Sequence, residues 1–483
     1  MSNGLSNTSA VSEKALVGEY GITIVKPTAS RATYGVLCFG SAPVSNATEN
    51  LHVPFKNVLF CENSSSSEVD LTYAVVDGEK IEIHQDCLDV GAYTLDSLPD
   101  MAHHIMLLSY QQGSKIPRVM IVLNNFGGQG NARKIYQSQI LPVLQAAHVE
   151  YAYMETEYSG HASDIARELE LSEYDIIACC SGDGVPHEVM NGFYQRADRE
   201  QAFEQIAITQ LPCGSGNALS LSSFGTNSAG IAAVKMLKLA RKRMDAMAVT
   251  QGSTTKISFL SQAYGIIADS DIGTEHLRWM GPMRFDFGVT QRLITNTTYP
   301  CDLFVKYVLR DNDEIQGHYN KHRFNPVDDR GATELELVAR FPTFDVLPPA
   351  DWEQLPREIT DNLSIFYVGK MPYVLSDAQF FPAALPNDGC MDMIITSAKT
   401  SFFKMAKLLF SIDKGRHIDS PDVLHAKISA YRLVPRIGAE NHFISVDGES
   451  FPFEPLQVEV LSRTLTVLLD EGAFVDTCLT GGS

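Results

Sequence analysis

The sequence Ile-Ile-Ala-Cys-Cys-Ser-Gly-Asp-Gly at residues 176–184 joins a short apolar run directly to a glycine-rich loop with one acid, Asp183. The same order recurs where the run 206–211 meets Pro-Cys-Gly-Ser-Gly-Asn at 212–217, and where the run 119–123 meets the glycines of 124–130. Short apolar runs bounded by turn signals are typical of buried strands. Because helical patterns follow these loops, we expect a parallel α/β sheet with its chemistry at the carboxyl ends of the strands.

Glycine loops of this kind let backbone N–H groups approach a phosphate, and a helix that starts behind them favours negative charge. Asp183 would then be a lone acid in a phosphate cradle, which indicates phosphoryl transfer. The loops match neither the Walker pattern, which needs Gly-Lys-Ser/Thr, nor a dinucleotide-binding fingerprint. The alternative, that the glycines only form tight turns, explains one such loop better than three.

Length, charge and cysteine content limit the class of protein. A chain of 483 residues has room for two or three domains. Its formal net charge of −20 argues against nucleic-acid binding. Nine scattered cysteines favour a reduced, cytoplasmic protein, and no apolar stretch reaches the ~18–20 residues of a membrane span. The basic residues between Lys235 and Arg243, in a helix-like run at 232–244, are either a solvated helix face or a contact for anionic headgroups.

Composition divides the chain into four segments. We expect a disordered tail at 1–30, a small β-rich domain at 31–114, an α/β domain at 115–250, and an antiparallel β domain at 251–483. In the last segment a helix is expected at about 402–410, and the polar stretches 311–333 and 342–358 are expected to be loops.

Several motifs resemble those of a known family. The Gly-Gly-x-Gly of 127–130, the Ser-Gly-Asp-Gly of 181–184 and the stretch 211–218 resemble the diacylglycerol kinase catalytic domain shared by lipid kinases. The later stretches resemble sphingosine kinases, and most closely the fungal sphingoid long-chain base kinases: Tyr-Gly-Ile-Ile-Ala-Asp-Ser-Asp at 264–271, Arg-Trp-Met-Gly-Pro-Met-Arg-Phe at 278–285, Lys-Gly-Arg-His at 414–417 and Val-Asp-Gly-Glu at 446–449. The resemblance covers about residues 119–449, and the N-terminal β segment fits the extension of the larger family members.

The resemblance implies a kinase with ATP in the cleft between a parallel-sheet α/β domain and a lipid-binding β-sandwich, with Mg²⁺ bridging the phosphates. Asp183 would be the general base that accepts the proton of the substrate hydroxyl. Ser261, Asp269, Asp271 and His417 would contact a sphingoid base, with Asp271 reading its ammonium group. The residues that would bind the nucleotide are Asn124, Gly127, Gly128, Gly130, Thr156, Ser181, Gly182, Gly184, Glu188, Gly214, Ser215, Gly216, Asn217, Arg278, Arg284, Asp447, Gly448 and Glu449.

The first glycine loop departs from the family pattern. That pattern often reads Asn-Pro-Arg/His-Gly-Gly-Lys-Gly, and here Asn125, Phe126 and Gln129 replace the proline, the basic residue and the lysine. Arg133 or Lys134 are candidates to replace the missing cations. The departure motivates one alternative, a nucleotide-binding scaffold without catalysis.

Other kinases are the remaining alternatives. The nearest is a ceramide or diacylglycerol kinase, and the more distant is a soluble sugar or NAD kinase. A sphingoid base kinase would meet its substrate through transient, peripheral contact with intracellular membranes. The sequence predicts no particular oligomeric state.

Overall fold

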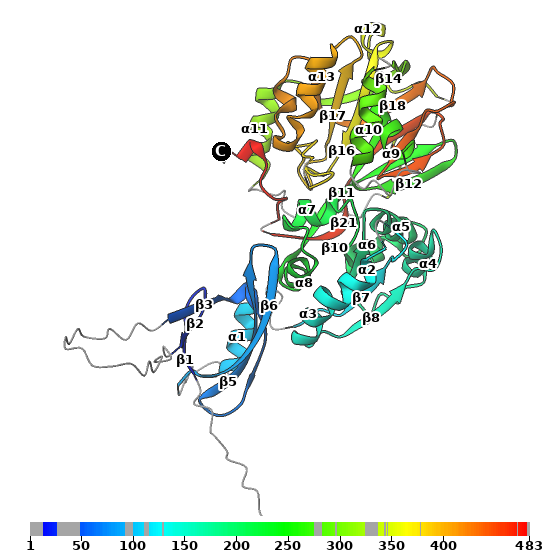
Figure 1. The fold of residues 1–483 in the computed structure, drawn as a ribbon. Helices are drawn as coiled ribbons and strands as arrows, with labels where there is room; N and C mark the ends of the chain where they lie inside the picture. Colours follow the sequence, from blue (N-terminus) through cyan, green and yellow to red (C-terminus); the bar gives the residue numbers. More distant parts are fainter. Residues whose placement is uncertain are drawn as a thin grey trace, which may run out of the picture. The chain divides into compact units, whose positions relative to one another are not determined.

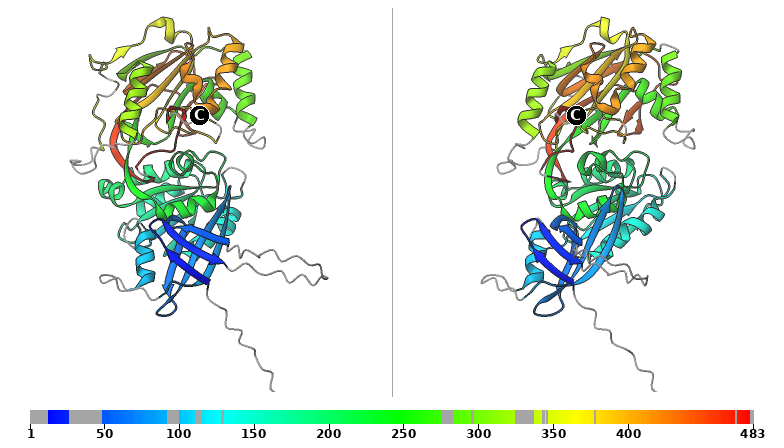
Figure 2. Two further views of the ribbon diagram at one scale, coloured as in Figure 1. Left: turned by 90° about the vertical axis from the view of Figure 1, so that its left-hand side faces the viewer. Right: turned by 60° about the vertical axis from the view of Figure 1, so that its left-hand side comes forward.

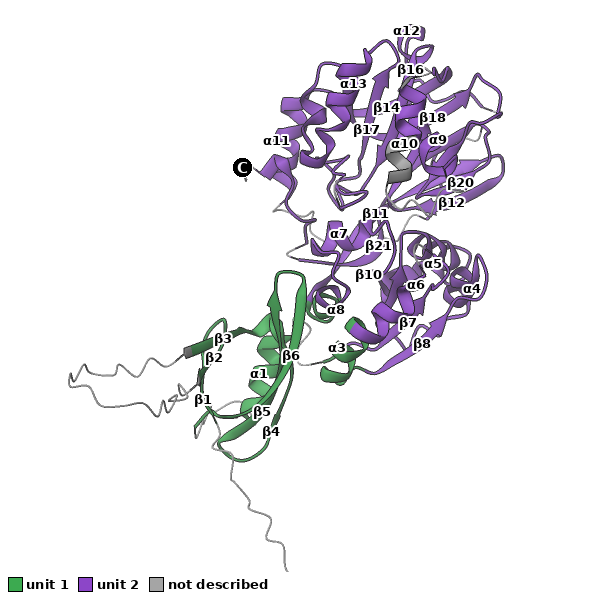
Figure 3. Cartoon of the chain, viewed as in Figure 1, with its two compact units in different colours: residues 1–116, 139–149, 233–238 green, residues 117–138, 150–232, 239–483 purple. Residues whose placement is uncertain are grey.

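The computed structural model describes residues 13–26, 49–91, 100–110, 115–127, 130–274, 283–294, 297–323, 337–341, 344, 346–376, 378–470 and 472–480, without the side chains of 26, 49, 283–287 and 294 (Figure 1). These residues form two compact units (Figure 3). Unit 1 contains residues 1–116, 139–149 and 233–238, and unit 2 contains the rest of the chain. No described helix is both long enough and apolar enough to cross a lipid bilayer.

Unit 1 is built on a six-stranded sheet with the order β3-β2-β1-β6-β5-β4. Its strands are β1 (Glu13–Val17), β2 (Gly21–Lys26), β3 (Glu49–Pro54), β4 (Val58–Asn63), β5 (Glu68–Asp77) and β6 (Lys80–Asp89). Helix α1 (Met101–Ser109) packs on β4, and Asp100 caps it by accepting a hydrogen bond of 2.6 Å from the His103 N–H. Only the pair β1–β6 is parallel.

The prediction of a disordered tail at 1–30 is wrong for residues 13–26. These residues form β1 and β2, and Ile22 and Ile24 of β2 are fully buried. Alternate burial of this kind is the ordinary pattern of a strand with one face on a core. The β-rich domain therefore begins before residue 31, and residues 139–149 and 233–238 of the expected α/β domain also belong to unit 1.

The first part of unit 2 is a parallel four-stranded sheet with the order β10-β9-β7-β8. Its strands are β7 (Val119–Leu123), β8 (Tyr151–Glu155), β9 (Ile176–Ser181) and β10 (Ala207–Pro212), which confirms the expected α/β fold. The helices between and after the strands are α2 (Ala132–Ile135), α3 (Leu141–Ala146), α4 (His161–Glu168), α5 (Gly184–Tyr194), α6 (Arg199–Gln205), α7 (Ala218–Phe224) and α8 (Ala229–Lys238), with a π-helical turn at Tyr136–Ile140. Of these, α3 and residues 233–238 of α8 belong to unit 1.

The second part of unit 2 is an antiparallel sheet that curls on itself (Figures 1 and 2). Its main path is β12-β11-β21-β18-β17-β16-β13-β19-β20, and β14 pairs with β18 and β15. The strands are β11 (Ala240–Gln251), β12 (Thr254–Ser258), β13 (Ser261–Gly265), β14 (Cys301–Leu309), β15 (Glu353–Gln354), β16 (Leu363–Gly369), β17 (Met391–Ser397), β18 (Val423–Pro435), β19 (Ile444–Val446), β20 (Glu449–Phe451) and β21 (Leu456–Leu469).

Helices cover parts of this sheet. They are α9 (Ile266–Ile272), α10 (Met283–Ile294), α11 (Asn312–Arg323), α12 (Arg357–Thr360) and α13 (Phe402–Leu409). Helix α13 confirms the helix expected at 402–410, whereas α11 occupies part of 311–333, where a loop is expected. The basic run is not one helix either, because α8 ends at Lys238 and Arg241, Lys242 and Arg243 lie on β11.

Candidate active site

The loops after the four parallel strands meet at one edge of the sheet. Leu123 at the end of β7 is in register with Cys180 of β9 and with Glu155 of β8, and Ser181 of β9 is in register with Pro212 of β10. Asn124, Thr156, Gly182 and Cys213 therefore begin neighbouring loops. This is the edge at which parallel α/β folds bind their ligands.

The two glycine loops after β9 and β10 touch backbone to backbone. A Cβ atom added to Gly214 would lie 2.4 Å from the Gly182 Cα, and one added to Gly182 would lie 3.0 Å from the Gly216 carbonyl oxygen. Asn217 closes the second loop, since its Nδ2 donates to the Gly214 carbonyl at 3.1 Å. These glycines are therefore required for loop packing as well as for any approach of a phosphate.

Asp183 lies where these loops meet, immediately before α5, and it is half-buried. Its Oδ1 accepts hydrogen bonds from the Ala218 N–H at 2.8 Å and from Gln210 Nε2 at 3.1 Å. Burial raises the pKa of this carboxyl to about 7, against the effect of both hydrogen bonds, and the nearby carboxylates of Asp447 and Asp271 add to the rise. A carboxyl with a pKa near neutrality is suited to accept a proton at physiological pH.

Gln210 is a site residue that the sequence analysis missed. It is fully buried on β10, and its amide connects Asp183 to the start of α7, because its Oε1 accepts from the Ser220 N–H at 3.1 Å. A glutamine inside the six-residue, fully buried strand β10 is an unusual choice. A polar residue at this position of the sequence could have indicated that Gln210 has a role in the site.

Glu449, on strand β20 of the antiparallel sheet, lies close to the loop that contains Asp183. A Cβ atom added to Gly184 would lie 2.8 Å from Glu449 Oε1, so this exposed carboxylate stands at the first residue of α5. Gly448 beside it has a φ of +83°, a conformation that favours glycine. The structure thus brings Glu449 close to the Asp183 loop.

Asp447 has a different role from its neighbour. It is almost fully buried, and its carboxylate accepts five hydrogen bonds. The donors are His187 Nδ1 at 2.8 Å, the Ser258 hydroxyl at 2.6 Å, and the backbone N–H groups of Phe259, Leu260 and Ser261 at 3.0–3.1 Å. Asp447 therefore ties α5 to the β12–β13 turn and has no oxygen to spare for a nucleotide.

Ser261 and Asp271 lie near Asp183, together with a residue that the sequence analysis did not identify, Tyr367. The Ser261 hydroxyl donates to the Tyr367 hydroxyl at 3.1 Å, and the Ser445 hydroxyl donates to Asp271 at 3.1 Å. Burial raises the pKa of Tyr367, and the negative charges of Asp271, Asp183 and Asp447 raise it further. Tyr367 follows an unremarkable strand pattern on β16, so the sequence carried no signal for it.

Asp269 and Asp271 do not form a pair. Asp269 is buried in α9, and its carboxylate accepts from the Tyr299 hydroxyl at 2.8 Å and from the Phe443 N–H at 3.0 Å, with His442 Nδ1 at 3.1 Å. Arg292 lies 3.4 Å away. This carboxylate stabilises the fold around α9, and we leave it out of the proposed substrate site.

Glu188 also has protein partners. From α5 its two carboxylate oxygens accept from the Gly160 and Ala162 N–H groups at 3.0 and 3.1 Å, which caps the first turn of α4. The expected contact of Glu188 with the nucleotide stays a prediction. The observed hydrogen bonds connect α5 to the first turn of α4.

His417 is fully buried in a 3-10 turn at Arg416–Asp419. Its Nε2 lies 3.0 Å from the Phe380 carbonyl oxygen, and burial lowers its pKa to about 4. The Phe380 ring packs edge-on against both His417 and Tyr367, with centroid separations of 5.7 and 4.9 Å. His417 is thus joined to the acid cluster through aromatic contacts and stays a candidate for an acyl-chain pocket.

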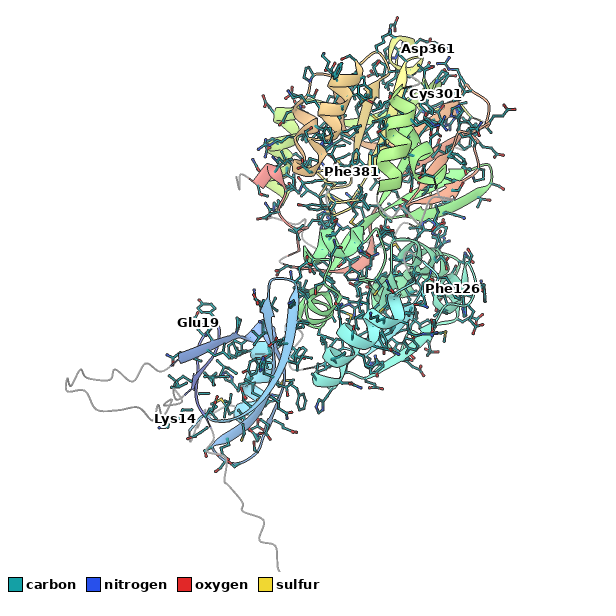
Figure 4. All side chains as sticks on the ribbon, in the orientation of Figure 1. Lys14, Glu19, Phe126, Cys301, Asp361 and Phe381 are labelled. Carbon is teal, nitrogen blue, oxygen red and sulfur yellow. The ribbon has the colours of Figure 1, made fainter. Side chains whose placement is uncertain are left out.

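The first glycine loop is held by its asparagines. Asn124 Oδ1 accepts from the Phe126 and Gly127 N–H groups at 2.8 and 3.2 Å, and Phe126 projects into solvent (Figure 4). Arg133, a candidate to replace the missing cations, is paired with Glu155, because its Nη2 donates to both carboxylate oxygens at 2.8 and 3.0 Å. Gly128, Gln129 and Arg278 lie outside the described residues, as does the side chain of Arg284.

Comparisons with known proteins agree with this arrangement. Residues 118–249 match the diacylglycerol kinase catalytic domain, and residues 361–469 match the YegS C-terminal NAD kinase beta sandwich-like domain. A solved structure of a putative diacylglycerol kinase from Bacillus anthracis is 16% identical, with a TM-score of 0.51 over 74% of this chain and 98% of its own. Fold and site together define a two-domain kinase of the diacylglycerol kinase class.

Individual relatives narrow the class. The chain is 39% identical to sphingoid long chain base kinase 5 of Saccharomyces cerevisiae over 83% of its own length and 66% of that protein. It is 30% identical to sphingoid long chain base kinase 4 of Schizosaccharomyces pombe over 98% and 99% of the two chains, and 30% identical to human sphingosine kinase 1 over 71% and 88%. The chain belongs to the family of sphingoid long-chain base and sphingosine kinases, which confirms the resemblance drawn from the sequence.

Proposed function

We propose that the protein transfers the γ-phosphoryl group of ATP to the primary hydroxyl of a sphingoid long-chain base, such as sphingosine, dihydrosphingosine or phytosphingosine. The observation that carries this proposal is the position of Asp183. It lies between two glycine loops, has a pKa of about 7, and stands near a second acid, Asp271. The names of the relatives support the same reaction.

The proposed step needs one base. Asp183 accepts the proton of the substrate hydroxyl while the hydroxyl oxygen bonds to the γ-phosphorus and the bond to the bridging oxygen of ADP breaks. Gln210 and the Ala218 N–H hold one carboxylate oxygen, so the other oxygen, Oδ2, is the one that we assign to the proton. Transfer of this kind depends mainly on positioning and charge neutralisation.

The nucleotide would lie along the loops at the carboxyl edge of the parallel sheet. Their backbone N–H groups suit phosphate oxygens, and we propose that Arg278 and Arg284 also contact the phosphates. The exposed carboxylate of Glu449, at the first residue of α5, is a hard oxygen donor of the kind that Mg²⁺ takes, so this residue fits the ion, while Asp183 is kept for the proton. When bound, Mg²⁺ would neutralise charge on the phosphates.

Substrate choice would depend on Asp271. A sphingoid base carries an ammonium group, whereas ceramide and diacylglycerol carry none, so a half-buried carboxylate selects the free base. We propose that the hydroxyls of Ser261 and Tyr367, which hydrogen-bond to each other, also contact hydroxyls of the substrate. We further propose a cytoplasmic location with peripheral attachment to intracellular membranes.

The test is transfer of labelled γ-phosphate from Mg-ATP to dihydrosphingosine, phytosphingosine, ceramide and diacylglycerol. We expect only the two free bases to be phosphorylated, with kcat/KM reduced at least tenfold in Asp271→Asn and activity abolished in Asp183→Asn. Transfer to ceramide or diacylglycerol that is insensitive to Asp271→Asn would reject the amine contact. ATP binding without transfer to any lipid would favour the scaffold instead.

A further inference from the structure

Helix α13 (Phe402–Leu409) has one face in the core and the opposite face in solvent. Met405 and Leu408, three residues apart, are buried, and Ile412 continues this buried stripe beyond the helix. This spacing places the three side chains on one side, against the antiparallel sheet. The outer side is therefore not needed to hold the helix in place.

That outer side carries large aromatic residues. Phe403 and Phe410, seven residues apart, are 85% and 83% exposed, and Phe402 beside them is 44% exposed. Seven residues are two helical turns, so both rings project from the same face. Single exposed apolar residues are common, but several aromatic rings on one short helix indicate a surface that is covered in use.

Basic residues lie close to these rings in the sequence. Residues 399–419 contain five lysines and arginines and two aspartates, a local formal charge of +3 in a chain of −20. Lys404 pairs with Asp422 at 3.1 Å, whereas Lys399, Lys407 and Lys414 form no ion pair among the described residues. Exposed aromatic rings beside lysines are the composition of a helix that lies in the interface of an anionic bilayer.

The same segment leads to the candidate active site. Three residues beyond Lys414, the buried His417 contacts Phe380, and Phe380 contacts Tyr367, whose hydroxyl bonds Ser261. A membrane bound at α13 would thus lie on the segment that borders the aromatic residues next to the acid cluster. In Figure 3, α13 is drawn in the upper part of unit 2.

We propose that the outer face of α13, defined by Phe402, Phe403, Lys407 and Phe410 with Lys399 and Lys414 beside them, inserts into an anionic lipid bilayer and delivers the active site to its lipid substrate. This proposal rests on the function proposed above for the choice of substrate. The docking itself can be measured without any activity. A second copy of the chain or a protein partner on this face would be a different outcome.

The test uses the full chain with vesicles of phosphatidylcholine alone or with about 30% phosphatidylserine. We expect co-sedimentation with the phosphatidylserine vesicles, at least a tenfold loss of binding in the double variant Phe403→Ala/Phe410→Ala, and a comparable loss in Lys407→Glu/Lys414→Glu. The matched control is Leu347→Ala, which removes an apolar side chain that is 84% exposed outside α13. It should bind vesicles as the unchanged chain does.

A second measurement separates this proposal from the proposed function. Phosphorylation of a sphingoid base in detergent micelles should be equal in the unchanged chain and the Phe403→Ala/Phe410→Ala variant, whereas phosphorylation of the base within vesicles should fall at least tenfold. Vesicle binding without any kinase activity would leave the docking surface standing and reject the function. Vesicle binding that is unaffected by the Phe403→Ala/Phe410→Ala change, or a dimer in sedimentation equilibrium that this change abolishes, would overturn the docking surface.

Discussion

At the scale of single residues, the proposed catalytic carboxyl of Asp183 destabilises the folded state when it is ionised. Burial raises the pKa of this carboxyl to about 7, whereas an unfolded chain has about 4. Between those values the folded state binds more protons than the unfolded state, so the free energy of unfolding falls as the pH rises from about 4 to about 7 and stays lower above it.

We therefore expect Asp183→Asn to abolish phosphoryl transfer and yet to stabilise the fold. At pH 8 the gain in the free energy of unfolding should be on the order of 2–4 kcal/mol, because the desolvated charge is gone while an amide oxygen still accepts from Gln210 and the Ala218 N–H. Urea unfolding at pH 8 and pH 5 provides the check, with a clearly smaller gain at pH 5. An equal gain at both pH values would show that the pKa is not raised.

The residues Asp447 and Glu449 should respond in opposite ways to loss of charge. Asp447→Asn places an amide N–H against groups that all donate, so we expect a loss of about 2–4 kcal/mol in the free energy of unfolding. Glu449→Gln should leave stability within about 0.5 kcal/mol, since its side chain is exposed, but weaken Mg-ATP binding severalfold. Thermal unfolding and nucleotide titration of both variants separate the two roles. Equal destabilisation would contradict this assignment.

At the scale of elements, the contact between the two glycine loops is the most restrictive feature of the site. We expect Gly214→Ala to reduce activity at least 100-fold and to destabilise the protein, because its Cβ would lie 2.4–2.5 Å from the Gly182 backbone. Gly317→Ala on α11 is the matched control, since its Cβ would meet nothing within 4 Å and this glycine is not one of the proposed nucleotide-binding residues. Steady-state kinetics and unfolding of both variants provide the measurement. Full activity of Gly214→Ala would mean that the loops separate easily.

Elements were predictable where their signal is local. The apolar runs before glycine loops gave β7, β9 and β10, and with them the position of Asp183. The prediction of one helix over 232–244 is wrong because the second half of this run belongs to β11. Strand β11 pairs with β21, more than 200 residues later, and no local sequence pattern indicates that pairing. The buried contacts of Asp447 and the position of Tyr367 could not be predicted for the same reason, because the partners of both residues come from distant strands.

At the scale of the whole molecule, a buried network of charges connects distant segments of the antiparallel sheet. Lys370 Nζ lies 2.7 Å from both Asp245 and Asp388, and Lys427 Nζ lies 3.0 Å from both Asp388 and Asp392. Burial alone would raise the pKa of Asp388, but Lys370 and Lys427 outweigh it and hold that pKa well below its usual range. The stability that this carboxylate contributes is therefore present above about pH 4 and is lost as the pH falls.

Removal of the Lys427 cation should make the contribution of the buried charge network to stability measurable. We expect Lys427→Met to lower the free energy of unfolding by about 3–5 kcal/mol at pH 7, because Asp388 and Asp392 stay buried with less positive charge beside them. The loss should shrink as the pH approaches 4, where both carboxyls can take up protons in the variant. Lys407→Met, on the exposed side of α13, is the control and should change stability by less than about 0.5 kcal/mol. Urea unfolding followed by circular dichroism between pH 4 and pH 7 measures both, and a Lys427→Met protein as stable as the control would show that the network contributes no net stability.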